Sequence, residues 1–386
     1  MTKRKWTPIF LLLTSVATFT AVSQSKSLNI TAEELKKIVR KAAEESANNA
    51  VKEVLKKQVT SRKRTDKSTQ NLPKKQATTK ILRIGSGAIG GNYFVLGELV
   101  GGVISHPSGS LPCGAGGSCG IMNLQSQNIS SAGSVANLNT LKDKTNQTGF
   151  VQSDIAYWAY TGTGLYAKEK KQSNLRAIAS LYPEAIHIIV NKEANINTIA
   201  KLAGKRVSLG AKKSGTLQGA RLVLNAYQIT EDKIQARYLN SADSIKALLK
   251  GELDAVFFTV GTSSPILNEL FKNNDKFTLL SIGNSQRQAI FKQGHYFSPF
   301  RIAANTYKGV PETKTISVYA LWLTTEKMDE GLVYALTKAL WGKPAKHLFK
   351  SSLIGHHISI ENSLKGIGIP LHSGAKKYYD EIGKRF

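Results

Sequence analysis

The first residues with chemical promise are the glycines of the stretch "ILRIGSGAIGGNYF", which begins at Ile81. Gly85, Gly87 and Gly90 follow a short apolar run in the pattern G-x-G-x-x-G. Glycine lets the backbone approach a bound anion closely, and the first N–H groups of a following helix attract that anion. Two kinds of loop fit this pattern, one that binds a dinucleotide and one that holds another anion such as a carboxylate.

The sequence argues against a nucleotide. A dinucleotide site needs an acidic residue about 20 positions after the glycines, to bind the ribose hydroxyls. That neighbourhood reads "GGVISHPSGSLPCG" and contains no acid. The phosphate-binding pattern G-x-x-x-x-G-K-[ST] is also missing from the chain. We therefore predict a loop that binds a carboxylate or a similar anion, and no cofactor.

Other reactive residues give no sign of an enzyme. The sequence has no G-x-S-x-G and no H-E-x-x-H, and its seven histidines are scattered. His356 and His357 are adjacent, which points their side chains apart, so no metal site is predicted there. Cys113 and Cys119, the only cysteines, lie in "PCGAGGSCG" without nearby His or Asp ligands. A local disulfide that pins the glycine-rich loop is the better prediction.

Composition and the first residues indicate export. The formal net charge is +27, but no zinc-finger spacing, aromatic RNA-binding pattern or arginine-rich tract favours nucleic acid. Lys3, Arg4 and Lys5 precede an apolar stretch of signal-peptide length, and small residues at 21–23 suit cleavage. We predict a signal peptide over residues 1–23 and a soluble periplasmic protein, with an uncleaved N-terminal anchor helix as the alternative.

Residues 24–79 differ in composition from the rest of the chain. Thr31 and Glu34 form a capping box, and Leu35, Ile38 and Val54 belong to an approximate apolar stripe at helical spacing. An amphipathic helix followed by a polar, basic linker is predicted. This arm is either a solvated tail or a segment that makes weak contact with an anionic membrane surface. The alternative function for the whole chain is an exported surface or adhesion protein that binds polyanions through the arm.

From residue 80 onward, short apolar runs alternate with helical patterns, which predicts an α/β fold with parallel-rich sheets. The predicted strands are 81–84, 148–152, 176–182, 186–190, 206–210, 235–240, 254–259, 278–283 and 316–323. The predicted helices are 92–104, 134–141, 154–160, 216–227, 241–250, 326–340 and 373–382. "ILRIGSGAIGGNYFVLGELV" and "KRVSLGAKKSGTLQGARLVL" both run from strand through loop to helix, as do "TGFVQSDIAYWAY" and "LDAVFFTVGTSSPIL". These echoes indicate two similar lobes that face each other across a ligand.

From about residue 80 to 386 the chain resembles the TAXI family of solute receptors for TRAP transporters. The resemblance rests on short stretches in a fixed order. They are "IGSGAIGGNYF", "SSAGSVANL", "GFVQSDIAYWAYTGTG", "LRAIASLYPEAIHIIV", "LAGKRVSLGAKKSGT", "GELDAVFFTVG" and "GIPLHSGAKKYYDE". Residues 26–79 lie outside it.

The resemblance implies a periplasmic-binding-protein fold of type II, the two-lobed Venus flytrap. Lobe 1 is expected over residues 80–183 plus 284–386, and lobe 2 over 184–283. The implied function is to capture a small carboxylate or an amino acid, with glutamate as the model candidate. The receptor then delivers the solute to the membrane subunits of a TRAP-type secondary transporter and hydrolyses nothing itself.

The matching stretches also supply candidate ligand-binding residues. Backbone donors, hydroxyls, amides and an aromatic face are expected to meet the ligand at Gly87, Gly91, Asn92, Tyr93, Ser134, Asn137, Gln152, Ser153, Tyr182, Glu184, Ser214, Gly215 and Thr216. Glu184 is the candidate partner of a ligand ammonium, and a salt bridge across the hinge is its alternative role. Ser214, Gly215 and Thr216 are candidate carboxylate ligands, or ordinary helix caps.

The chain departs from the commoner family pattern at two places. Lys212 and Lys213 stand where small residues are usual, and either favour acidic solutes or lie on the rim. The insertion "HPSGSLPCGAGGSCG" is longer than in many relatives, and is expected to shape the mouth of the cleft or to touch the transporter.

Overall fold

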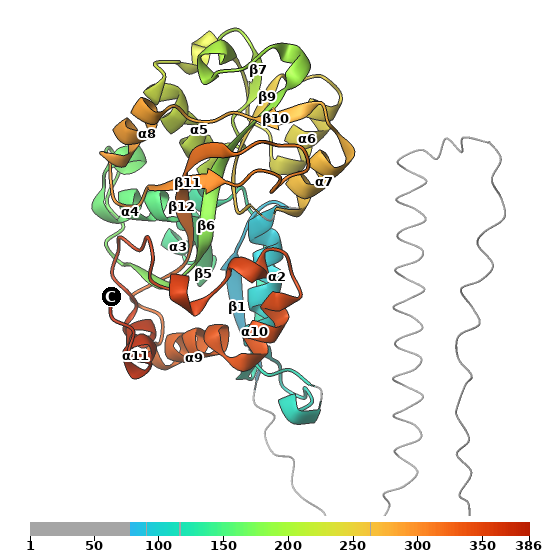
Figure 1. Ribbon diagram of the computed structural model, residues 1–386. Coiled ribbons are helices and arrows are strands. Elements are labelled where there is room, and N and C mark those ends of the chain that lie inside the picture. Colours follow the sequence, from blue (N-terminus) through green and yellow to red (C-terminus); the bar gives the residue numbers. More distant parts are fainter. Residues whose placement is uncertain (1–77, 90, 116, 263) are drawn as a thin grey trace, which may run out of the picture. The chain divides into compact units, whose positions relative to one another are not determined.

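The computed structural model describes residues 78–386 apart from 90, 116 and 263 (Figure 1). The predicted signal peptide and nearly all of the basic arm therefore lie outside the described residues. Within residues 78–386, helices pack against both faces of a single twisted sheet. This arrangement confirms the predicted α/β class.

The sheet contains twelve strands among the described residues, in the order β3-β2-β4-β1-β5-β12-β6-β9-β7-β8, with β10 beside β6 and β11 beside β12. The strands are β1 (Lys80–Gly85), β2 (Ser105–His106), β3 (Ile121–Met122), β4 (Leu124–Ile129), β5 (Thr148–Gln152), β6 (Leu175–Asn191), β7 (Arg206–Ser208), β8 (Gln235–Arg237), β9 (Ala255–Val260), β10 (Phe277–Leu279), β11 (Ser298–Ile302) and β12 (Thr313–Thr325). β1 is parallel to β4 and β5, and β7 is parallel to β8 and β9. β6 and β12 run antiparallel to their neighbours, so the sheet is mixed and less parallel than predicted.

The α-helices are α2 (Asn92–Ile104), α3 (Ser134–Lys142), α4 (Ser153–Thr161), α5 (Gly215–Ala226), α6 (Ser241–Leu249), α7 (Pro265–Asn273), α8 (Asn284–Phe291), α9 (Glu330–Trp341), α10 (Lys343–Lys350) and α11 (Ser373–Glu381). α2 illustrates why they form. Leu96, Val100 and Ile104 recur at helical spacing and are fully buried in the core. The pairs of sequence echoes correspond to β1–α2 with β7–α5, and to β5–α4 with β9–α7, which confirms their strand-to-helix pattern.

The apolar cores divide the molecule into two lobes. The buried residues of two clusters come from 82–182 and 320–379, and those of two others come from 185–318. Tyr157 and Trp158 of α4 pack against one of the latter pair. Only β6 and β12 pass from one group of clusters to the other within the described residues. These two long strands cross between the lobes side by side, near Glu184 and its register partner Val318.

The packing of residues 284–318 differs from the predicted assignment to lobe 1. Ile290, Ile302 and Ile316 are buried in clusters with residues 185–282. The physical reason is that β11 pairs with the first half of β12, so the chain returns to the first lobe only inside β12. We therefore propose that lobe 1 comprises residues 80–183 plus 320–386, and lobe 2 residues 184–319.

Several elements differ from the sequence prediction. The two strands predicted at 176–182 and 186–190 form one strand, β6, because Pro183 lies inside a ladder with β12 without breaking it. The sequence does not predict β4, α8 or α10, since "LQSQNI", "NSQRQAIF" and "KPAKHLFK" are rich in polar residues. Predicted strand 235–240 ends early, because Asn240 instead caps α6.

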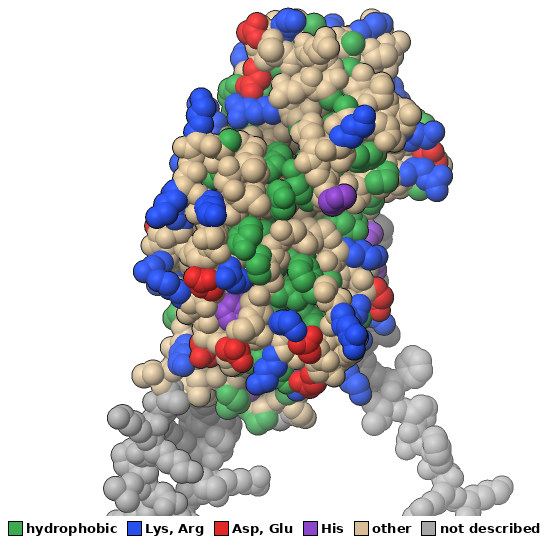
Figure 2. Space-filling view, turned by 90° about the vertical axis from the view of Figure 1, so that its left-hand side faces the viewer, with side chains coloured by type: hydrophobic (Ala, Val, Ile, Leu, Met, Phe, Trp, Pro, Cys, Tyr) green, Lys and Arg blue, Asp and Glu red, His purple; other side chains and the backbone are tan. Residues whose placement is uncertain are grey.

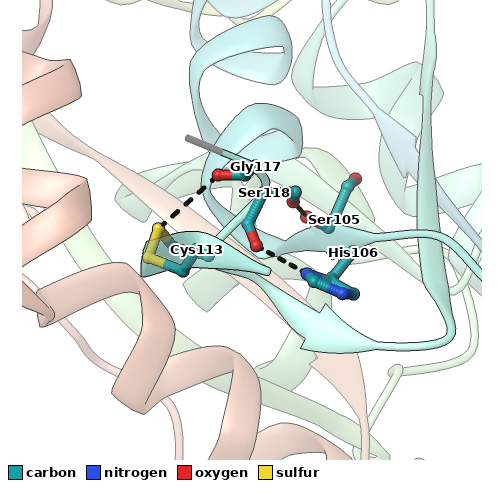
Figure 3. Close-up of a disulfide and its surroundings, with 6 residues drawn as sticks. Ser105, His106, Cys113, Gly117 and Ser118 are labelled. Carbon is teal, nitrogen blue, oxygen red and sulfur yellow. Dashed lines mark hydrogen bonds between the residues drawn. A yellow bond between two sulfur atoms is a disulfide. The ribbon is translucent and has the colours of Figure 1, made fainter. Parts of the chain in front are cut away.

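The predicted disulfide between Cys113 and Cys119 is confirmed (Figure 3). Their Cα atoms are 4.5 Å apart. Beside the bridge, Ser118 holds the loop to β2, where its carbonyl oxygen lies 2.5 Å from His106 Nδ1 and its hydroxyl donates to the carbonyl of Ser105. The loop lies at the end of the first lobe near α10 (Figure 1), and none of its described residues lines the interlobe cleft.

The face shown in Figure 2 carries its basic charge spread out rather than concentrated. On the face shown in Figure 2, Lys and Arg side chains are scattered from one end to the other, with Asp and Glu among them and an apolar band between. Across residues 78–386, none of the described helices combines the length and the apolar character that a bilayer-crossing segment requires.

Candidate functional site

A cleft between the lobes is surrounded by the beginnings of four helices. α2 and α3 approach from the first lobe, and α5 and α6 from the second. The N–H groups in the first turn of a helix have no acceptor within that helix, and the helix dipole makes that end partly positive. Four such ends directed at one cleft create a site for an anion without requiring a positively charged side chain.

Asn92 at the start of α2 is the most informative lining residue. The cap residue before it, Gly91, has no side chain to bond the first N–H groups. Asn92 itself is 3% exposed, and neither its amide nitrogen nor its amide oxygen has a hydrogen-bond partner among the described residues. A buried amide without partners costs roughly 1–3 kcal/mol. A polar ligand that supplies both a donor and an acceptor would satisfy both groups.

Glu184 is the only acidic residue among the described residues that line the cleft, and none of them is basic. It lies on β6 where the strand crosses between lobes, and it is 2% exposed. Tyr93 Oη donates a hydrogen bond of 2.8 Å to its Oε2. Burial raises the pKa of Glu184 to about 8, helped by the nearby carboxyl of Asp154 and opposed by hydrogen bonds from Tyr93 and Gln152.

A second buried carboxyl stands behind the first. Asp154, in the first turn of α4, is 1% exposed, and its Oδ1 has no partner among the described residues. Burial raises the pKa of Asp154 to about 7, although backbone hydrogen bonds oppose the shift. Neither carboxyl has a basic partner among the described residues, so a cation beside Glu184 would be stabilised there.

The second lobe supplies hydroxyls and backbone groups. Ser214 caps α5 by accepting a hydrogen bond of 3.1 Å from the N–H of Leu217. Gly215 lies against Gln152, whose Oε1 would be 2.1 Å from a Cβ at that position, so glycine permits the lobes to approach. Thr216 Oγ1 accepts from the N–H of Thr259 at 3.3 Å. Ser241 and Ser244 of α6 also line the cleft.

Most of the predicted ligand-binding residues come together in this cleft. Those that line it are Gly87, Gly91, Asn92, Tyr93, Ser134, Gln152, Glu184, Ser214, Gly215 and Thr216. Lys212 and Lys213 are exposed and do not line it. Lys212 instead places its Nζ 5.6 Å from the centre of the Tyr238 ring.

Three predicted residues lie behind the lining and hold the framework. The amide nitrogen of Asn137 donates to the carbonyls of Ser86 and Phe150 at 2.7 and 2.8 Å, which joins α3 to β5. Ser153 Oγ accepts from the N–H of Tyr319 at 3.0 Å, which ties α4 to β12. Tyr182 is buried within the first-lobe core.

The prediction missed the lining residues of α6 and β9. Asn240 caps α6 by accepting from the N–H of Asp243 at 2.9 Å. The sequence "NSAD" carries that capping signal, although the predicted strand 235–240 includes Asn240. Phe257 and Thr259 lie on β9, a fully buried strand, where nothing in the residue pattern distinguishes the face toward the ligand from the face toward the core.

The chain belongs to the NMT1-like family, whose model matches residues 84–383. Among solved structures it is similar to the alkanesulfonate-binding protein SsuA from Xanthomonas axonopodis pv. citri bound to MOPS. That match has 14% identity, 79% coverage of this chain, 84% of the other and a TM-score of 0.40. PhnD1 from Prochlorococcus marinus in complex with methylphosphonate matches with 16% identity and a TM-score of 0.47, over 80% of this chain and 100% of the other. MatC from Rhodopseudomonas palustris with bound malate matches with 12% identity and a TM-score of 0.47, over 78% of this chain and 96% of the other.

Proposed function

We propose that this member of the NMT1-like family is an extracytoplasmic solute-binding receptor, not an enzyme, that captures a small amino acid with glutamate as the model ligand. The observation that carries the proposal is the pairing of two unlike features in one cleft. Four helix N-termini favour carboxylates, and Glu184, the one carboxyl among the described residues that line the cleft, favours an ammonium group. An α-amino acid has both groups, whereas a dicarboxylate supplies no cation to Glu184.

In this proposal the ligand spans both lobes. One carboxylate lies at the start of α2 or α3, where Asn92 and Ser134 add side-chain hydrogen bonds. A second carboxylate, as in glutamate, lies at the start of α5 or α6. The ammonium lies between them against Glu184, which Tyr93 holds in place. Bending of β6 and β12 then closes the lobes over the ligand.

The proposal includes delivery to the membrane subunits of a TRAP-type secondary transporter of the TAXI class. Its support is the order of the matching stretches from "IGSGAIGGNYF" to "GIPLHSGAKKYYDE". Uptake into vesicles that contain those subunits is expected to need this receptor and an ion gradient, and to proceed without ATP. Uptake that requires ATP hydrolysis would assign the receptor to another class of transporter.

The decisive experiment is thermal unfolding of the purified protein with L-glutamate and with glutarate. The two compounds differ only in the ammonium group. L-glutamate at about 100 times its dissociation constant should stabilise the folded state by about 2.7 kcal/mol, which raises the melting temperature by several degrees. Glutarate should have a much smaller effect.

A broader panel of amino acids and dicarboxylates, together with native mass spectrometry of freshly purified protein, covers other members of the proposed class. A flat response across the panel with no co-purified ligand would contradict the receptor function. A dicarboxylate that stabilises more than every amino acid would contradict the role of Glu184.

A further inference from the structure

Lys213 lies in the second lobe beside the cleft and contacts the first lobe through its backbone. Its carbonyl oxygen accepts a hydrogen bond of 3.2 Å from the N–H of Ala136, in the first turn of α3. That N–H belongs to the group of helix-start donors for which α3 has no internal acceptor. A carbonyl of one lobe therefore satisfies a free N–H group at the start of a helix in the other.

The backbone of Lys213 adopts an unusual conformation to make this bond. Lys213 has a φ of 65°, in the left-handed region that favours glycine. It lies in a turn over residues 211–214, closed by a hydrogen bond of 3.0 Å from the N–H of Ser214 to the carbonyl of Ala211. A side chain in this region of φ is disfavoured, so the lysine reduces the stability of the turn.

The backbone of the turn is packed against the first lobe, whereas the Lys213 side chain is not. Gly133, just before α3, has a φ of 116°, and a Cβ there would lie 3.6 Å from the Cα of Ser214. Gly215, just after the turn, lies against Gln152 of the first lobe. The Lys213 side chain is exposed and does not line the cleft. The two lobes thus meet backbone to backbone next to the ligand site.

We propose that Lys213 is a positioning residue for ligand capture, which sets how readily the lobes close through the left-handed backbone that directs its carbonyl to α3. The ammonium of Lys213 has no part in this role. Ligand affinity then depends on the residue at position 213 through its tolerance of positive φ. This statement about affinity rests on the proposed function, whereas the contact between Lys213 and Ala136 does not.

Three variants separate backbone from charge. Lys213→Gly removes the conformational penalty and should slow deuterium exchange of the Ala136 amide in the ligand-free full chain by about fivefold, measured by NMR. Lys213→Val makes positive φ harder to adopt and should speed that exchange by about tenfold. Lys213→Ala loses the charge and keeps a Cβ, so exchange should stay within about twofold of the wild type. Lys212→Ala is the matched control for loss of charge in the same turn.

The same variants are then titrated with L-glutamate by calorimetry. Affinity should follow the exchange data, about fivefold tighter for Lys213→Gly and about tenfold weaker for Lys213→Val. Equal exchange rates in the glycine and valine variants would overturn the proposal, as would equal weakening by glycine and alanine. If Ala136 exchange responds as expected but L-glutamate fails to bind the wild type, the proposed ligand is wrong and the interlobe contact stands.

Discussion

Two asparagines at the starts of neighbouring helices have opposite roles. Asn137 is fully bonded to the framework, whereas Asn92 has no partner. Asn137→Ala should therefore lower the free energy of unfolding by about 3 kcal/mol, because it leaves the carbonyls of Ser86 and Phe150 unsatisfied. Asn92→Ala should leave stability unchanged or higher and weaken ligand binding by at least about tenfold.

Chemical denaturation and calorimetry of both variants check this contrast. Asn92→Ala that binds L-glutamate as tightly as the wild type would show that the unpartnered amide does not face the ligand. At the level of single residues, this distinction could not be predicted from the sequence. Both asparagines lie in the first turn of a helix whose cap residue is glycine, and only the packing reveals which one already has its hydrogen bonds.

Glu184 should make the ligand-free protein less stable as the pH rises. Its pKa is about 8 in the folded state, above the ordinary value of 4.5, so the folded state holds more protons than the unfolded state between these values. Stability is therefore greatest below about pH 4.5, as far as this group is concerned, and falls as the pH approaches 8. Glu184→Gln should reduce the fall in melting temperature between pH 6 and pH 9, while the exposed control Glu193→Gln should not.

Ligand binding should show the opposite dependence on pH. An ammonium ligand needs the ionised form of Glu184, so the affinity for L-glutamate should increase from pH 6 to pH 8. Glu184→Gln should weaken binding at every pH in that range and abolish the trend. Calorimetric titrations of both proteins measure this, and a glutamine variant with unchanged affinity would exclude Glu184 from the site.

Among the elements, α9 and α11 meet so closely that their contact requires glycine. A Cβ at Gly374 would lie 2.2 Å from the carbonyl oxygen of Glu330 and 2.7 Å from the backbone nitrogen of Tyr334. Gly374→Ala should therefore separate the helices and lower the free energy of unfolding by about 1–3 kcal/mol. Ligand affinity should not change, because neither helix contributes to the cleft lining.

Gly102 is the matched control, since it lies on the exposed side of α2 and its Cβ would meet only Leu348 Cδ2 at 3.4 Å. Gly102→Ala should be neutral, or stabilising by up to about 1 kcal/mol through helix propensity. Urea denaturation of both variants gives the comparison. Equal stability of the two would show that the α9–α11 contact adapts to a methyl group.

The elements that could be predicted best have strong local signals. α2 and β5 were predicted with the observed bounds. An apolar stripe at helical spacing marks α2, and a short apolar run that ends at polar residues marks β5. β2 and β3 are two residues long, and their pairing depends on an insertion whose path the sequence does not specify. β11 was missed because Pro299 suggests an interruption, although on this strand it pairs with Ile316 at the edge of the sheet.

For the whole molecule, the disulfide loop should be independent of ligand capture. It belongs to the first lobe, and none of its described residues lines the cleft. Replacing Cys113 and Cys119 together by serine should leave the affinity for L-glutamate unchanged and lower the melting temperature by a few degrees at most, since the bridge closes a short loop. Calorimetry and thermal unfolding check both expectations, and a loss of affinity would connect the insertion to the cleft after all.

The two-lobed organisation could be predicted from the repeated strand–loop–helix pattern. The residue at which the chain returns from the second lobe to the first could not. The chain first passes between the lobes in "YPEAIHIIV", where Pro and Glu interrupt the apolar residues. It passes back inside β12, where apolar residues lie on both sides of that point. Position 319 is distinguished only by a change of neighbours, from β11 to β5. Such a change is a property of the assembled sheet.

The pairing of Glu184 with Val318 has a consequence for the history and engineering of the chain. Residues on adjacent strands in register lie about 5 Å apart, so the second lobe leaves and rejoins the first at neighbouring points. It is therefore an insert with adjoining ends, held in an otherwise continuous host domain. Joining positions 184 and 318 by a tight turn would give the host domain without the second lobe. Joining them instead to a related lobe with the same spacing between its ends would give a chimaera. Exchange of whole lobes could thus change the solute without redesigning the surface of the host.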